Sequence, residues 1–151
     1  MNTVKLLKNS NSQPLPKKPY RFWINPGLIV TILLGTLIGT YLDLFYVGKG
    51  YYSFPMRPFP DIFSVHVGFT LVGLPLILVV FLLFCDKLNF VGKIGAVLLL
   101  ASIMTSGEKL SEGFGWFLHD PEWKHIYSLF GYTIYLSLLL IVYSFFSMKK
   151  T

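Results

Sequence analysis

The sequence predicts an all-α integral membrane protein, built as an antiparallel bundle of four transmembrane helices. Hydrophobic residues make up 54% of the 151 residues and charged residues only 13%, whereas soluble domains usually carry about a quarter charged residues. The apolar residues form four long blocks rather than amphipathic faces, which indicates lipid as the solvent. The formal net charge of +6 comes from Lys and Arg that flank these blocks. That placement is typical of membrane topology and does not indicate a nucleic-acid-binding face.

Residues 1–22 are rich in Asn, Ser, Pro and Lys and show no apolar period, so we expect a mobile basic tail in the cytoplasm. A cleaved signal peptide is the alternative interpretation. The apolar block that follows is longer than a typical signal core, however, and shows no small-residue cleavage pattern. We therefore predict that residues 23–151 form the transmembrane domain and that its first block is a retained span.

The first span is predicted at about residues 26–46, with Asn25 as the cap of a helix whose first residue is proline. Gly35 and Gly39 lie four residues apart in a row of small residues. Such a row predicts close helix packing, within the bundle or between two copies of the chain. The same row continues to Asp43, which falls near the outer boundary because about twenty residues of helix are needed to cross a membrane.

The segment 47–60 contains three prolines among aromatic residues and predicts an irregular loop that lies at the outer membrane surface. A second span is expected at about residues 62–85, with Asp61 as its cap. His66 is the only titratable acid or base inside this span, and Pro75 is expected to bend the helix near its middle.

The third span is predicted at about residues 90–112 and depends on an argument from length. Only fourteen residues separate Lys93 from Glu108, which gives about 21 Å of helix against a hydrocarbon core of about 30 Å. We therefore expect the helix to continue through Glu108 to Glu112. The fourth span, at about residues 126–148, contains no charged residue before its final lysines.

The distribution of basic residues predicts the orientation of these four spans. With the termini inside, nine Lys and Arg residues lie on the cytoplasmic side and four on the outer side. Cytoplasmic loops are enriched in Lys and Arg. We therefore predict a multi-pass protein with both termini in the cytoplasm.

In this topology a candidate polar cluster gathers near the outer leaflet. Its members are Asp43, His66, Glu108, Lys109 and Glu112. Ionisable groups inside a membrane suggest a functional site because an unpaired charge there is costly. We expect the first three to converge inside the bundle. The alternative is structural pairing, for example of Asp43 with Lys49 or Lys109.

A metal site is a weaker hypothesis for the same end of the bundle. His119 and His125 are the weak candidates for metal ligands, since imidazole and carboxylate groups bind divalent metals. No established spacing of metal ligands occurs in the chain, and the two histidines are also compatible with an ordinary solvated loop. No cofactor is predicted from the sequence.

The runs LDLFYVGKG and FPMRPFPDIFS, with SEGFGWFLHDPEWKHIYSLFGY further along the chain, resemble a family of small four-span membrane proteins from spore-forming Gram-positive bacteria. The likeness extends from about Gly35 to Tyr135. The resemblance implies a four-helix fold in a bacterial plasma membrane. Members of that family have no established activity, so the resemblance implies no catalytic residues.

Two classes of function follow from these observations. The first is a non-enzymatic membrane component that acts as an assembly partner, in contact with the lipid bilayer and with a membrane protein or a second copy of itself. The alternative is a small membrane enzyme or transporter that uses the acids and histidines near the outer leaflet. The first is favoured because no serine elbow, phosphate loop or nucleophile pair occurs in the chain.

Overall fold

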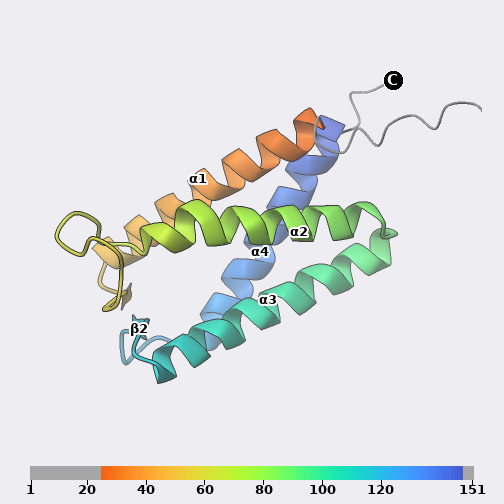
Figure 1. The fold of residues 1–151 in the computed structure, drawn as a ribbon. Helices are drawn as coiled ribbons and strands as arrows, with labels where there is room; N and C mark the ends of the chain where they lie inside the picture. The colour runs from red at the N-terminus through yellow and green to blue at the C-terminus, as the bar shows by residue number, and fades with distance from the viewer. Residues whose placement is uncertain (1–24, 148–151) are drawn as a thin grey trace, which may run out of the picture.

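The computed structural model describes residues 25–147, and four long helices dominate that part of the chain (Figure 1). Each helix is long and apolar enough to cross a membrane, the second when its π-helical first turn is included. The N-terminal tail and the two C-terminal lysines of the predictions lie outside the described residues. The elements in chain order are α1 (Pro26–Gly48), β1 (Tyr52–Ser53), η2 (Phe69–Gly73), α2 (Leu74–Asp86), α3 (Phe90–Gly113), β2 (Leu118–His119) and α4 (His125–Ser147).

Asparagine side chains cap two of the helices. The Asn25 side chain accepts a hydrogen bond from the Gly27 amide at 3.1 Å, with Pro26 at the first helical position. This cap was predicted from the sequence and is confirmed. Asn89 accepts from the Gly92 amide at 2.8 Å in the same way and begins α3. In both cases the side chain satisfies an amide that has no partner within the helix.

The second helical segment begins at Val67, with the π-helical turn η2 starting at Phe69, so the predicted start at Ile62 is wrong. Residues 61–66 form turns and bends, and Asp61 does not cap a helix. The Arg57 guanidinium holds the irregular chain between residues 54 and 63, because it donates to three of its backbone carbonyls. These carbonyls belong to Phe54, Pro60 and Phe63, at 2.7, 3.2 and 2.6 Å. They are therefore satisfied without a helix, which the sequence pattern did not reveal.

His66 lies just before this helical segment rather than one turn inside it. Its Nδ1 accepts a hydrogen bond from the Phe69 amide at 3.0 Å, so the imidazole acts as the cap. The π-helical turn η2 then leads into α2, immediately before Pro75. Pro75 has no amide hydrogen to donate, and a wider turn at this point accommodates that loss.

The third helix runs continuously through its acidic residues, as the length argument predicted. It has 24 residues and includes Glu108, Lys109 and Glu112 in its last two turns. Its ionisable groups therefore lie on a helix and not on a loop. This continuity gives the candidate site a regular framework.

The four helices form a bundle in which α1 packs against α2 and α4, and α3 packs against α4. The first turn of α1 lies beside the last turn of α4, since a Cβ added at Gly27 would lie 2.8 Å from Ser147 Oγ. The loops 49–68 and 114–124 lie together at the opposite end, which we call the loop end (Figure 1). The helices α2 and α3 meet at their connecting turn and separate toward the loop end.

The core is a thin layer of leucines between helices, and Leu78, Leu82, Leu136 and Leu139 are almost fully buried. Most of the remaining apolar side chains point outward. In each of the four spans, between 17% and 33% of the most apolar window is buried. A surface so rich in exposed leucine, isoleucine and phenylalanine is typical of helices that face lipid.

Gly35 and Gly39 lie where α1 approaches its neighbours most closely. A Cβ added at Gly35 would lie 2.7 Å from Leu78 Cδ1 and 3.0 Å from Leu139 Cδ1, and one added at Gly39 would lie 2.5 Å from Leu74 Cδ2. The Tyr135 hydroxyl also donates to the Gly35 carbonyl at 2.8 Å. The small residues therefore allow α1 to contact both α2 and α4 within one chain.

Candidate functional site

A cavity of about 800 Å³ opens between α2 and α3 at the loop end. This is the region where the two helices have separated. The wall is mostly apolar and includes Phe69, Ile77, Leu100, Ile103 and Met104 from the two helices, with Phe54, Met56 and Phe117 from the loops. The polar groups of the lining are Asp43, Tyr52, His66, Glu108, Ser111 and Tyr132. Asp43, His66 and Glu108, which we expected to converge, thus line one cavity.

Asp43 is positioned by its own helix and by the short sheet. The strands β1 and β2 pair antiparallel, with Tyr52 opposite His119, and this pairing fixes Tyr52 over the end of α1. The Tyr52 hydroxyl donates to Asp43 Oδ1 at 2.6 Å. Burial, and then the nearby Asp43 carboxylate, raise the pKa of Tyr52 well above its usual range. Tyr52 therefore remains a hydrogen-bond donor to this carboxylate at neutral pH.

A tyrosine on α4 fixes the position of the Glu108 side chain. The Tyr132 hydroxyl donates to Glu108 Oε1, and the Glu108 side chain is 15% exposed. Its second oxygen, Oε2, is buried and has no hydrogen-bond partner. Two tyrosines thus each donate to one carboxylate at the polar end of the cavity, and one carboxylate oxygen of Glu108 is left unsatisfied.

Glu112 joins two histidines from the opposite side of the cluster. His119 Nδ1 lies 2.5 Å from Glu112 Oε1, and the backbone amide of His119 also donates to that oxygen at 3.2 Å. His125 Nε2 lies 3.4 Å from Glu112 Oε2. His119 Nε2 faces Glu108 Oε2 at 3.6 Å. The four side chains form one connected group between α3, β2 and the start of α4.

Aromatic rings fix the orientation of His119. Trp123 stacks on the imidazole with centroids 5.3 Å apart and planes 7° apart. Phe117 and Tyr52 meet the same ring edge-on, at 4.6 and 5.9 Å. The His119 side chain is only 5% exposed. A ring held in this way on a sheet residue presents its two nitrogens in fixed directions.

The structure does not join all the residues of the predicted cluster by direct contacts. His66 lines the cavity, but its hydrogen bond is to the Phe69 amide, and among residues 25–147 no hydrogen bond or ion pair links it to Asp43 or Glu108. Lys109 is exposed and forms no ion pair within the described part of the chain. The alternative pairing of Asp43 with Lys49 or Lys109 is not observed, because Tyr52 is the hydrogen-bond partner of Asp43.

Tyr52 and Tyr132 were not identified from the sequence. Aromatic residues near a membrane boundary are usually interfacial anchors. That interpretation did not predict that these two tyrosines donate hydrogen bonds to carboxylates. One signal was available for Tyr132, which lies seven residues after His125 and therefore on the same face of α4. No comparable periodicity exists for Tyr52, because its position depends on the pairing of two short strands far apart in the chain.

The chain matches no protein-family model, no curated protein and no solved structure at significant similarity. The resemblance to a family of four-span bacterial proteins therefore stays a prediction. The geometry and chemistry of the site are therefore the basis for inferring a function.

Proposed function

We propose that this protein is a multi-pass membrane protein that binds an amphipathic, lipid-like molecule in the cavity between α2 and α3. The cavity is the observation that carries the proposal. Its volume of about 800 Å³ falls within the range of about 300–1,000 Å³ typical of small-molecule sites. Its wall is apolar along the helices, while its hydrogen-bonding groups are concentrated at the loop end.

The location of the cavity favours entry from the lipid. The two helices that form its sides expose apolar residues to their surroundings, for example Leu71, Leu76 and Leu99 at about 60% or more. A molecule with an apolar chain can lie between such helices with its chain parallel to the neighbouring lipid. Its polar head then reaches Asp43, Tyr52, Glu108 and Tyr132.

The charges in the lining determine which polar heads are compatible. Two carboxylates and one histidine line the cavity, and no Lys or Arg does so within residues 25–147. Arg57, which lies in the loop that contributes to the lining, donates to three backbone carbonyls. A phosphate head would meet two acids without a compensating cation. We therefore expect a neutral hydroxyl-bearing or a cationic amine head, which can donate to the carboxylates.

We further propose a bacterial cell membrane as the location, with both termini in the cytoplasm and the loop end outside. The nine-to-four asymmetry of Lys and Arg supports this orientation. It agrees with a fold in which α1 begins beside the end of α4. The polar end of the cavity then lies in the outer leaflet.

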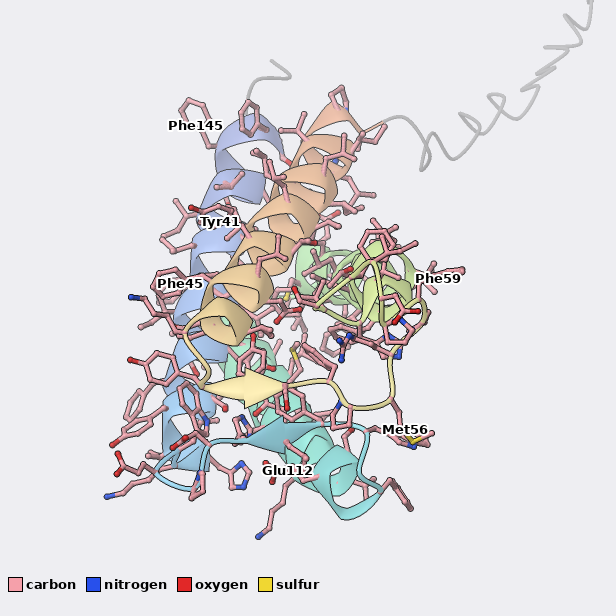
Figure 2. The ribbon with its side chains drawn as sticks, turned by 90° about the vertical axis from the view of Figure 1, so that its left-hand side faces the viewer. Tyr41, Phe45, Met56, Phe59, Glu112 and Phe145 are labelled. Atoms are coloured by element: carbon pink, nitrogen blue, oxygen red, sulfur yellow. The ribbon has the colours of Figure 1, made fainter. Side chains whose placement is uncertain are left out.

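An interaction with a membrane partner remains a second candidate, and one observation favours it. The loop after β1 exposes Phe59 and Ile62 at 65% and 73%, and Figure 2 shows Phe59 pointing away from the bundle. Apolar side chains presented in this way suit either the headgroup layer or a partner helix. The cavity nevertheless supports ligand binding more directly than this loop supports assembly.

A cavity-filling variant tests the proposal. Gly107 lines the cavity, and a Cβ at this position would meet no atom within 4 Å. Gly107→Leu therefore adds a side chain at the cavity wall whose Cβ meets no neighbouring atom. Gly95→Leu is the matched control, because Gly95 lies on the same helix, also has open space around it, and does not line the cavity.

Binding is measured on the detergent-solubilised full chain with a brominated monoacylglycerol, which quenches the fluorescence of a tryptophan that it contacts. Trp116 lines the cavity and reports binding there. We expect saturable quenching in the wild type and Gly95→Leu, at least tenfold weaker binding in Gly107→Leu, and no saturable binding of a brominated lysophosphatidic acid of the same chain length. Equal quenching in Gly107→Leu and Gly95→Leu would contradict the proposal.

A further inference from the structure

Three buried polar atoms at the loop end have no hydrogen-bond partner. They are Glu108 Oε2, His119 Nε2 and His125 Nδ1. Each of the three residues can offer one ligand atom such that all three atoms lie within 4.8 Å of one another. We propose that Glu108, His119 and His125 bind one divalent transition-metal ion. This inference goes beyond the proposed ligand-binding function; Glu108 belongs to both sites, and the charges given above for the cavity are those of the metal-free protein.

The hydrogen bonds around the histidines support this assignment. Glu112 Oε1 lies 2.5 Å from His119 Nδ1, which favours the tautomer with the proton on Nδ1 and leaves a lone pair on Nε2. Glu112 Oε2 lies 3.4 Å from His125 Nε2, which is an ion-pair distance. Metal-bound histidines commonly donate their other ring N–H to a carboxylate in this way. Glu112, which lies at the loop end (Figure 2), therefore positions both histidines.

The distances fit a small cation. His119 Nε2 and Glu108 Oε2 are 3.6 Å apart. Two ligand atoms held about 2.0–2.2 Å from a tetrahedral zinc ion lie about 3.3–3.6 Å from each other. A lone pair and a carboxylate oxygen that face each other across this gap repel one another unless a positive charge lies between them. The His119 side chain is 5% exposed, so bulk water does not relieve this repulsion.

The cluster also holds two acidic side chains that have no Lys or Arg partner within the described residues. Glu108 and Glu112 are these side chains and contribute two negative charges. A divalent ion at this position would supply the missing positive charge. Two histidines with one carboxylate are a donor set found in zinc and in non-haem iron sites. Tyr132 holds the other oxygen of Glu108, so Oε2 is presented to the ion.

Zinc is the test ion for the full-length protein in detergent. The protein is stripped with a chelator and titrated with Zn²⁺ in competition with a chromophoric chelator, and Co²⁺ is added separately to record its optical spectrum. We expect one equivalent of bound zinc and the intense visible absorption of a four-coordinate cobalt site. Glu108→Gln and His119→Ala should lose this equivalent. Glu112→Gln should bind about 10- to 100-fold more weakly, because it removes only the positioning carboxylate.

Two further variants keep the test decisive. His66→Ala is the matched control, since His66 lines the cavity but lies outside the three-residue site, and it should retain full zinc binding. His125→Ala changes the most exposed ligand, at 36%, and should lose the zinc while the helical circular dichroism spectrum stays unchanged. A wild type that takes up no zinc would overturn the proposal. Uptake that persists in Glu108→Gln and His125→Ala would overturn it as well.

Discussion

Replacing Tyr52 with phenylalanine removes a single hydroxyl from the polar end of the cavity. This hydroxyl donates to Asp43 Oδ1 at 2.6 Å, and no other described hydrogen bond reaches the Asp43 side chain. Hydrogen bonds to charged groups contribute about 1.5–3 kcal/mol, and a buried carboxylate left without its donor has a desolvation cost of similar size. We therefore expect Tyr52→Phe to lower the free energy of unfolding by about 1.5–3 kcal/mol.

Tyr51→Phe is the matched control for this prediction. Tyr51 is adjacent in sequence, 45% exposed, and its hydroxyl makes no hydrogen bond within the described residues, so its loss should change stability by less than about 0.5 kcal/mol. Both variants are compared by reversible unfolding in mixed micelles with increasing SDS. If the two variants unfold at the same SDS fraction, the hydrogen bond from Tyr52 to Asp43 does not stabilise the fold as expected.

Three further predictions concern packing, pH and topology. Gly35→Ala should be about 1–3 kcal/mol less stable than Gly48→Ala in the same SDS titration, because both gain helix propensity but only Gly35 faces buried leucines. Folding raises the pKa of Tyr52, so the contribution of its hydroxyl to the free energy of unfolding is complete below pH 10 and falls above pH 10 by about 1.4 kcal/mol per pH unit. The difference in stability between the wild type and Tyr52→Phe should therefore narrow above pH 10. In intact cells an impermeant maleimide should label Phe59→Cys and not Lys87→Cys, and the reverse pattern would refute the proposed orientation.

The helices were largely predictable because their signals are local. Apolar blocks, the cap at Asn25 and the fourteen-residue interval before Glu108 each depend on residues close together in the chain. The start of the second helical segment was not predictable in this way. It depends on Arg57, whose guanidinium satisfies carbonyls of the preceding turns, and on His66, which caps the helix.

The level of the site along the bundle was predictable from the sequence, but the partners of its side chains were not. Chain length placed Asp43, His66 and Glu108 at the same level, and all three line one cavity. Their partners come from distant segments: the Tyr52–His119 pairing joins two loops 67 residues apart, and Tyr132 reaches Glu108 from another helix. A single sequence holds no signal for such long-range contacts beyond side-chain chemistry.

Photolabelling tests the central claim, that the cavity binds a lipid-like molecule, most directly. A monoacylglycerol with a diazirine in its chain is irradiated with the detergent-solubilised protein, and the labelled residues are mapped by mass spectrometry. We expect labelling of Ile103 and Met104 in the cavity wall, reduced by unlabelled monoacylglycerol and by Gly107→Leu. Labelling confined to the exposed outer face of α1, around Leu33 and Leu37, with no competition, would contradict the account.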